Sequence, residues 1–381
     1  MNEKIAVILG LNDTGLYTSQ LFSKYGYKVY GIDYDKENNG FYSKKLQAIL
    51  TNNPLENPES NLKILINLGS QYNNKPIILA TSEIYLYFIL TYKHILQNYF
   101  FMILPNNEIL KKIINKSGQF ELAKNLGFDF PEYLVIDNED AFEEIKVKKF
   151  DFPLLIKGDN QPLWKNKELS KSYIVKNYKE LYEISKKLFN LKITFIIQKI
   201  IPGPITNNYE YNTLVYNGKI ICESVIHKIR QYKEPYGSAC CIEISSKEII
   251  NKLGREYVLK NNIEGFSNTE FKYNPEDGKY YFIECNARVW WQIKLTEHIN
   301  ISYIKNYIDI YEHNIINYKY KKLRHIMWVD FPFDFLLCLR YIRINPLLFI
   351  KYLFNYRKVR SFGLLCFNDM TPFFHAIHLI K

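Results

Sequence analysis

The sequence contains the stretch EFKYNPEDGKYYFIECNAR at residues 270–288, in which two strand-like segments flank an Asn-Pro-Glu-Asp-Gly turn. Glu270, the first residue of this stretch, ends one apolar run. Glu284, Asn286 and Arg288 alternate along the second, so a strand would place these three side chains on one face. We interpret the two carboxylates and the amide as ligands of one or two Mg2+ ions, and the arginine as a phosphate contact. The alternative interpretation is the solvated face of an edge strand, but the apolar residues before Glu284 indicate a strand covered on both faces, where a carboxylate needs a partner.

The composition is that of a globular protein with a sizeable core and several structural units. The chain has 381 residues, of which 47% are apolar and 23% charged. A formal charge of +11 favours anionic partners such as nucleotides, phosphorylated substrates or an anionic lipid surface. We expect no nucleic-acid partner, because the sequence has neither zinc-ligand spacing nor a ribonucleoprotein strand motif.

The cysteines and the apolar segments indicate the cellular environment. The six cysteines form no C-x-x-C pair and several lie in apolar runs, which predicts reduced, buried thiols. No run of about 18 apolar residues occurs. The first apolar run leads into a turn instead of a small-residue cleavage site. We therefore expect a cytoplasmic protein.

The first half of the chain divides into two predicted units. Residues 1–108 begin with a strand, loop, helix and strand that predict a parallel sheet, and the loop Thr81 to Glu83 follows a further strand at an end that could touch substrate. Residues 109–190 contain an apolar strand that delivers Lys157 at its end. The alternative for this lysine is a surface amine with a buried stem. The polar loop after it resembles a lid.

A third unit is predicted at residues 191–325. Its first strand runs into Pro202-Gly203 and would present backbone donors and acceptors of the kind that read an adenine ring. A hairpin is predicted around Asn217-Gly218. Lys228 and Arg230 follow two residues apart, and they are either solvated charges or contacts to an anionic substrate.

The sequence changes character at residues 326–381, a basic, aromatic C-terminal extension. Just before it, basic residues cluster at Lys319, Lys321, Lys322 and Arg324. Around residues 336–356 cations interrupt helical apolar spacing, which predicts either a helix packed on the core or one lying on a membrane surface. Packing on the core is the interpretation we prefer.

Five stretches in this order resemble the ATP-grasp superfamily, and within it the carboxylate-amine ligases that include D-aspartate ligase. The resemblance implies an α/β (α+β ATP-grasp) fold. A Rossmann-like, parallel-sheet pre-ATP-grasp domain (1–108) would precede two α+β subdomains that clasp ATP (109–190 and 191–325). The stretches are KSGQFELAKNLGFDFPEY (116–133), FPLLIK (152–157), IIQKIIPG (196–203), HKIRQYKEPYGSACCIE (227–243) and EFKYNPEDGKYYFIECNARVWWQ (270–292).

The resemblance also implies roles for individual residues. Lys116 and Lys157 would hold the phosphates of ATP. Glu270, Glu284 and Asn286 would coordinate Mg2+ or Mn2+. The adenine would meet Gln198, Lys199, Ile200 and Ile201, and the catalytic contacts would come from Arg288, Lys228 and Arg230. The sequence departs from the usual pattern at Gln198, where many relatives have Glu, and in the loop from Gly158 to Trp164, which is less rich in small residues.

The implied activity is ATP-dependent ligation of a small-molecule carboxylate to an amine through an acyl phosphate, with an amino acid among the expected substrates and cell-envelope or secondary-metabolite synthesis as the setting. An alternative is an ATP-grasp carboxylase or a purine-pathway type of ligase. Another is a noncatalytic nucleotide-binding protein on the same fold.

Overall fold

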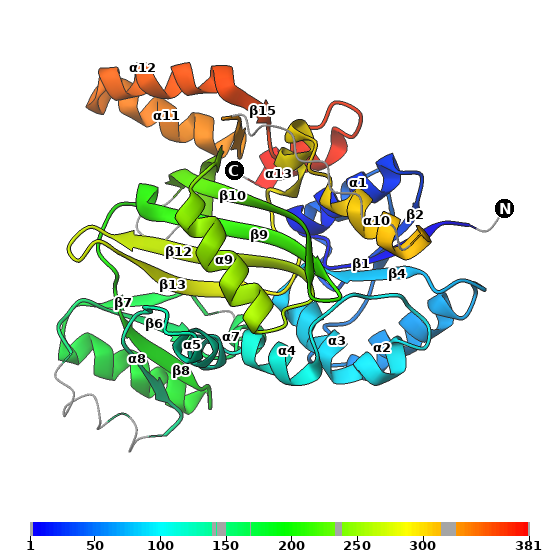
Figure 1. The fold of residues 1–381 in the computed structure, drawn as a ribbon, viewed down its shortest axis with the longest axis horizontal. Helices are drawn as coiled ribbons and strands as arrows, with labels where there is room; N and C mark the ends of the chain where they lie inside the picture. Colours follow the sequence, from blue (N-terminus) through cyan, green and yellow to red (C-terminus); the bar gives the residue numbers. More distant parts are fainter. Residues whose placement is uncertain are drawn as a thin grey trace.

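The described part of the chain contains three β-sheets in the computed structural model (Figure 1). The structure describes residues 3–138, 142, 150–167, 169–232, 238–313 and 325–379. The predicted basic cluster at Lys319, Lys321, Lys322 and Arg324 lies outside the described residues.

The N-terminal sheet is parallel, with the strand order β3-β2-β1-β4. Strand β1 is buried on both faces, because Ala6 and Ile8 pack with α1 while Val7 and Leu9 pack with α2 and α3. Helix α1 begins after Asn12, whose side chain accepts the N–H of Gly15. The elements are β1 (Ile5–Leu9), α1 (Asp13–Lys24), β2 (Lys28–Asp33), η1 (Asn39–Tyr42), β3 (Gln47–Leu50), α2 (Pro58–Gly69), β4 (Ile77–Ala80) and α3 (Glu83–Leu96).

A smaller antiparallel sheet has the order β5-β8-β6-β7. It has a hydrophobic core of its own, in which Ile156 and Phe195 of the sheet pack with Leu181 of α8 and with Trp164. The described residues of this core all lie between residues 134 and 197. The elements of this part of the chain are α4 (Asn107–Ile114), α5 (Lys116–Asn125), β5 (Tyr133–Ile136), β6 (Leu154–Gly158), α7 (Gln161–Lys165), β7 (Tyr173–Val175), α8 (Tyr178–Asn190) and β8 (Phe195–Lys199).

The large sheet is antiparallel except at its last pair, and its order is β13-β12-β9-β10-β11-β14-β15. The predicted hairpin is present, with Asn217 and Gly218 both at positive φ between β9 and β10. The elements are η2 (Ile205–Asn207), β9 (Asn208–Tyr216), β10 (Lys219–Tyr232), β11 (Ser238–Ser245), α9 (Glu248–Lys260), β12 (Gly265–Asn274), β13 (Lys279–Asn286), η3 (Ile293–Ile299), α10 (Tyr303–His313), β14 (Met327–Val329), α11 (Phe333–Ile344), α12 (Pro346–Asn355), η4 (Tyr356–Lys358), β15 (Val359–Ser361) and α13 (Thr371–Leu379).

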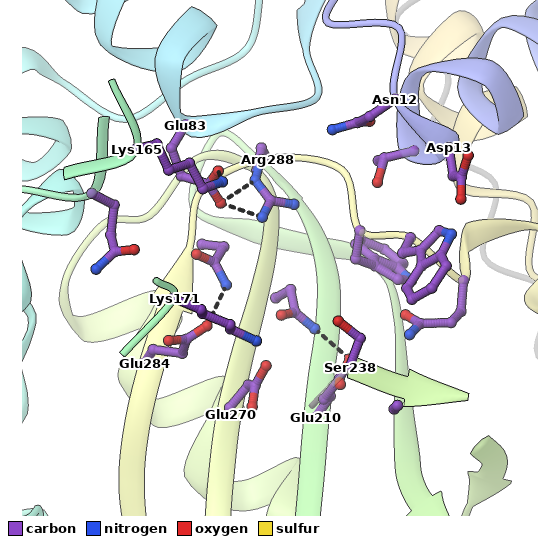
Figure 2. Close-up of a pocket in the computed structure, with 18 of the residues that line it drawn as sticks. Asn12, Asp13, Glu83, Lys165, Lys171, Glu210, Ser238, Glu270, Glu284 and Arg288 are labelled. Atoms are coloured by element: carbon purple, nitrogen blue, oxygen red, sulfur yellow. Dashed lines mark hydrogen bonds and ion pairs between the residues drawn. The ribbon is translucent and has the colours of Figure 1, made fainter. Parts of the chain in front are cut away.

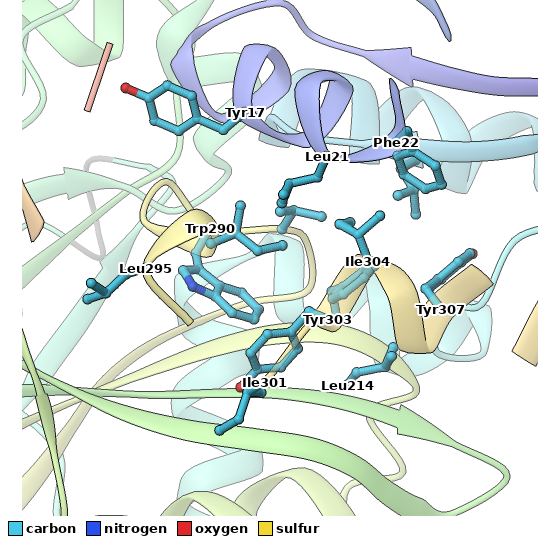
Figure 3. Close-up of a cluster of buried hydrophobic side chains, with 14 of the residues drawn as sticks. Tyr17, Leu21, Phe22, Leu214, Trp290, Leu295, Ile301, Tyr303, Ile304 and Tyr307 are labelled. Atoms are coloured by element: carbon cyan, nitrogen blue, oxygen red, sulfur yellow. The ribbon is translucent and has the colours of Figure 1, made fainter. Parts of the chain in front are cut away.

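The N-terminal sheet and the large sheet share a hydrophobic core. Figure 3 shows Leu21 and Phe22 of α1 facing Ile304 of α10, with Trp290 and Tyr303 between them and the large sheet. The rings of Trp290 and Tyr303 pack edge to face, with their centroids 4.6 Å apart. The N-terminal unit is therefore fixed to the large sheet by common packing. None of the described residues of the small sheet belongs to this cluster, but Ile196 of β8 is buried in a second cluster that contains residues of both other units.

Strand pairing differs from two of the boundaries expected from the sequence. Strand β8 begins after residue 190, yet it pairs with β5 and β6 in the small sheet. Strands β14 and β15 belong to the predicted C-terminal extension, yet they continue the large sheet beyond β11. Local patterns identify these strands but not their partners, which are set by contacts distant in sequence.

The five cysteines at positions 222, 240, 241, 285 and 338 are buried, and Cys366 is partly exposed. All six are free thiols, as predicted. None of the helices that the structure describes is long and apolar enough to cross a membrane.

Helix α11 is attached to strand β10 by an ion pair inside the protein. Arg230 donates to both carboxylate oxygens of Asp334 at 2.7 Å, and both side chains are almost fully buried. Tyr356 donates its hydroxyl to the same carboxylate at 2.8 Å. The ring of Tyr352 on α12 lies 4.5 Å from the guanidinium. These contacts fix the C-terminal helices on the large sheet.

We predict that Asp334→Ala destabilises the protein by about 3–5 kcal/mol, because the buried guanidinium of Arg230 would lose its counter-ion. Urea unfolding followed by circular dichroism measures the change. The control is Glu256→Ala, which breaks an exposed i,i+4 pair with Lys260 and should cost less than about 1 kcal/mol. Equal effects of the two substitutions would contradict the assignment.

Candidate functional site

Three neighbouring strands bring glutamates and asparagines together in two parallel rows. In the register of β9, β12 and β13, Glu210 lies opposite Glu270, which lies opposite Glu284. Two residues away, a second row consists of Asn212, Asn268 and Asn286. Because alternate residues of a strand share a face, both rows project from the same face of the sheet.

These rows form one wall of a cavity of about 760 Å³. Figure 2 shows Glu210, Glu270 and Glu284 side by side on adjacent strands, with Glu83 and Arg288 at one end of the cavity and Asp13 at the other. The remaining lining residues come from the N-terminal unit, from the start of α5, from the segment that follows β6, from β10 and β11, and from the segment after β13. The cavity therefore lies where all three sheets meet.

Lysines neutralise the glutamates. Lys116, at the start of α5, places its Nζ 2.6 Å from Glu284 Oε2. Lys228 on β10 places its Nζ 2.6 Å from Glu270 Oε2 and 3.2 Å from Glu210 Oε1. Burial alone would raise the pKa of Glu284, but Lys116 and the nearby Lys157 hold it well below its usual range. Burial would likewise lower the pKa of Lys228, but Glu270 and Glu210 raise it.

Lys157 responds differently to the same surroundings. It is the last residue but one of β6, and burial lowers the pKa of its ammonium group to about 8, although Glu284 acts in the opposite direction. The neighbouring charges of Lys116 and Lys171 also favour loss of the proton. Near neutral pH this lysine is a cation with a weakly held proton, which would be retained more firmly beside an anionic ligand.

Arg288 is oriented by a carboxylate of the N-terminal unit. Glu83, in the first turn of α3, accepts from both Nε and Nη2 of Arg288. It also accepts from Lys165 Nζ of α7 at 2.6 Å. Burial alone would raise the pKa of Glu83, but the two cations hold it well below its usual range. One carboxylate thus connects the N-terminal unit, the loop after β6 and the end of β13.

The opposite end of the cavity is acidic and aromatic. Asp13, at the N-terminus of α1, accepts from Asn39 Nδ2 at 2.7 Å. Burial raises the pKa of Asp13. Trp290 and Trp291 also line the cavity, and Figure 2 shows Asn12 and Asp13 across from Ser238. The cavity therefore has a cation-rich end and an acidic end.

The donor set beside Arg288 fits a magnesium ion. Two carboxylates and an amide, from Glu270, Glu284 and Asn286, project from paired strands, and oxygen donors of this kind are what Mg2+ prefers. Among the described residues, no three His, Cys, Asp or Glu side chains already converge in a metal-binding arrangement. Lysines hold the carboxylates instead, and Asn286 Nδ2 donates to Glu284 Oε1 at 3.1 Å.

Comparison with known proteins begins with the sequence. No family model matches the chain. D-aspartate ligase of Enterococcus faecium (strain Aus0004) is 23% identical over 244 residues, which cover 60% of this chain and 57% of that protein. The chain thus matches little more than half the length of this relative.

Solved structures extend the likeness. L-amino acid ligase from Bacillus licheniformis superposes with a TM-score of 0.62 at 17% identity, over 81% of this chain and 74% of that one. N5-carboxyaminoimidazole synthetase from Staphylococcus aureus complexed with ADP gives 0.64 at 13%, over 86% and 82%. The biotin carboxylase domain of Hydrogenobacter thermophilus 2-oxoglutarate carboxylase, in complex with MgADP, gives 0.64 at 15%, over 86% and 73%. The chain has the ATP-grasp fold.

Half of the twelve site residues predicted from the sequence line this cavity. The described residues that line it include Lys116, Lys228, Glu270, Glu284, Asn286 and Arg288. Lys157 is close enough to influence Glu284 and to be influenced by it. The loop at Thr81 to Glu83, expected to touch substrate, supplies the Glu83 contact to Arg288. The chemical roles of these residues remain predictions.

Two predicted sets lie elsewhere. Arg230 is buried against Asp334 and is not among the described lining residues, so its predicted contact with substrate is corrected to a structural ion pair. Lys228 and Arg230 are two residues apart, so a regular strand would place them on the same face. The pairing of β10 with β11 has a register shift between them, and their side chains have different partners. The segment Gln198, Lys199, Ile200 and Ile201 lies at the end of β8, where Lys199 pairs with Glu132 at 2.9 Å; its adenine contact remains a prediction.

Sequence reasoning missed several residues of this cavity. Glu210 could not be assigned, because its importance lies in its position opposite Glu270 on a strand about 60 residues distant in the chain. Asn268, which lies opposite Asn212 on β9, was missed for the same reason, whereas no local sequence pattern indicates Asp13 or Trp290. The loop after Lys157 forms the short helix α7, capped by Asn160, and Trp164 is buried within it. Asn-Gln-Pro at its start is a readable helix-start signal.

We predict that Glu83→Ala destabilises the protein by about 1–3 kcal/mol, because Arg288 and Lys165 would lose a shared, largely buried partner. The control is Glu59→Ala, which removes an exposed carboxylate from the first turn of α2 and so the same favourable helix-dipole interaction. Thermal unfolding of both variants measures the difference. A loss no larger than that of the control would show that the ion pairs contribute nothing to stability.

Proposed function

We propose that the protein is an ATP- and magnesium-dependent ligase that joins a small-molecule carboxylate to an amine, forming an amide bond with release of ADP and phosphate. The observation that carries this proposal is the row of Glu210, Glu270 and Glu284 with its lysines, beside an arginine, in a cavity of the ATP-grasp fold. The likeness to D-aspartate ligase and to L-amino acid ligase supports an amino acid as one of the substrates.

The first step brings two anions together, a carboxylate and the terminal phosphate of ATP. Their repulsion must be offset, and Lys116 and Arg288 at one end of the cavity, with Lys157 close by, would do so. Glu270, Glu284 and Asn286 would hold magnesium, which supplies further neutralisation of phosphate charge when bound. The carboxylate oxygen attacks the phosphorus, ADP leaves, and an acyl phosphate results.

The second step forms the carbon–nitrogen bond. The amine nitrogen attacks the acyl carbon, phosphate leaves with its bonding electrons, and the nitrogen loses a proton. Phosphate is a much better leaving group than the oxide that an unactivated carboxylate would have to release. Arg288, held by Glu83, is placed to stabilise the charge that develops on the oxygens.

The acidic end of the cavity suits the amine. Asp13 is a carboxylate whose pKa burial raises, so it can attract an ammonium group and take up a proton from it. Trp290 and Trp291 provide apolar surface beside it. Because Arg288 and Asp13 line opposite ends of the cavity, the activated carboxylate and the amine would approach each other from two sides.

The proposal is tested by measuring ADP release in the presence of carboxylates and amines in all pairwise combinations, with bicarbonate included. Release that depends on both a carboxylate and an amine, with a stable amide detected by mass spectrometry, is the expected result. Release with bicarbonate alone would identify the carboxylase alternative instead. Nucleotide binding without turnover under any combination would contradict ligation.

The same assay tests whether Glu284 acts as a metal ligand. Glu284→Gln should lower magnesium-dependent turnover about a hundredfold or more, because the substitution removes the charge but keeps the shape and an oxygen acceptor for Lys116. The control is Glu276→Gln in the exposed turn between β12 and β13. Circular dichroism should show both variants folded, and wild-type turnover of Glu284→Gln would refute the metal assignment.

We also predict that nucleotide affinity depends on pH through Lys157. The free lysine has a pKa of about 8, and a bound phosphate would raise it, so binding takes up a proton above that pH. Affinity for ADP should therefore fall about fivefold between pH 8 and 9. Lys157→Arg, which keeps its charge, should flatten this dependence, whereas Lys63→Arg on α2 should not. Calorimetric titration with ADP at each pH measures the affinity. If Lys157→Arg and the wild type showed the same dependence of affinity on pH, Lys157 would not be the group that takes up the proton.

A further inference from the structure

The C-terminal helical hairpin, formed by α11 and α12 at residues 333–355, exposes an unusual amount of apolar surface. Helix α12 has the sequence PLLFIKYLFN, yet none of its residues is buried. At the tip, Ile344 is 76% exposed and Leu347 is 80% exposed. The exposed large apolar side chains of the hairpin are Leu336, Leu339, Ile342, Ile344, Leu347, Ile350, Leu353 and Phe354. So many exposed large apolar side chains on one pair of helices indicate an interaction site.

The exposed charges of the hairpin and of the short strand that follows it are all positive. Within residues 333–361, all of which the structure describes, the basic side chains are Arg340, Arg343, Lys351, Arg357, Lys358 and Arg360, and each is exposed. Asp334 is the one carboxylate in this range, and it is fully buried against Arg230. An anionic partner would therefore meet positive side chains and no exposed carboxylate within residues 333–361.

The hairpin is both attached and accessible. Figure 1 shows α12 as the outer helix of the pair, with α11 between it and the large sheet. The Arg230–Asp334 ion pair and the buried Cys338 hold α11 on β10 and β11. The apolar side chains of α12 consequently cannot be covered by movement of the helix onto this sheet without breaking an internal ion pair.

We propose that this hairpin docks the protein on an anionic lipid surface. Its apolar side chains would enter the boundary between head groups and acyl chains, while the arginines and lysines contact the negatively charged head groups. With ten residues, α12 is about 15 Å long, which suits a helix lying in the interface and is too short to cross the bilayer. The net charge of +11 attracts the whole protein to the same surface.

An anionic membrane fits these features better than a second copy of the chain. Two hairpins brought face to face would place like charges against each other, with no exposed carboxylate of residues 333–361 to pair with them. A lipid surface instead offers negative charge and an apolar interior at the same place. The docking proposal stands independently of the ligase activity, because no hairpin residue is among the described residues that line the cavity.

The test is co-sedimentation of the full chain with vesicles of phosphatidylcholine alone or of phosphatidylcholine with phosphatidylglycerol. We expect binding that rises with the phosphatidylglycerol fraction and weakens as salt is increased. The double variant Ile344→Gln/Leu347→Gln should bind about tenfold more weakly, because two exposed apolar side chains are lost. Its matched control, Leu50→Gln/Ile249→Gln, changes exposed apolar side chains on β3 and α9 and should bind as wild type.

Charge is tested separately with Arg343→Glu/Lys351→Glu, which should lower binding at least tenfold, against Lys63→Glu/Lys186→Glu on α2 and α8. ADP release without vesicles should be unchanged in the hairpin variants, which shows that they remain folded. Equal binding of hairpin and control variants would overturn the proposal, as would salt-independent binding to phosphatidylcholine alone. Sedimentation velocity that shows a dimer dissociated by Ile344→Gln/Leu347→Gln, without vesicle binding, would assign the surface to self-association instead.

Discussion

The site depends on the register of three antiparallel strands. If β13 slipped by one residue against β12, Glu284 and Asn286 would turn to the opposite face and the row of carboxylates would be broken. Packing fixes this register. A register shift between Glu270 and Phe271 pairs Phe271 with Phe282 on the face opposite to the glutamates, where both rings are buried together with Tyr257 of α9. The hydrophobic face of the sheet thus determines the geometry of its polar face.

The alternation of Glu284, Asn286 and Arg288 was visible in the sequence, and so was the hairpin at Asn217-Gly218, because both are local patterns. The ATP-grasp fold was predicted from the order of five such stretches. Partners distant in sequence could not be predicted. Nothing near Arg230 indicates that its counter-ion is Asp334, more than a hundred residues later, and nothing near Glu210 indicates that it lies opposite Glu270.

Packing divides the molecule in a way that bears on how the cavity opens. The N-terminal unit and the large sheet share buried residues, including Trp290 and Tyr303, whereas most of the buried residues of the small sheet pack with α8 in a separate core. Strand β8 also buries Ile196 against the cluster that contains α5 and the large sheet, so a change in the position of the small sheet would disturb that packing. Such a change would also break the polar contact of Lys165 with Glu83 at the cavity.

The lysine–glutamate pairs also have an energetic consequence. Lys116 and Lys228 are largely buried and are oriented by Glu284 and Glu270. Phosphate oxygens and a divalent ion that entered together would replace each of these contacts by one of the same polarity. The lysines thus occupy positions beside the glutamates that a divalent ion would take. Such an exchange avoids exposing a bare buried charge at any stage, which keeps the reorganisation free energy of binding small.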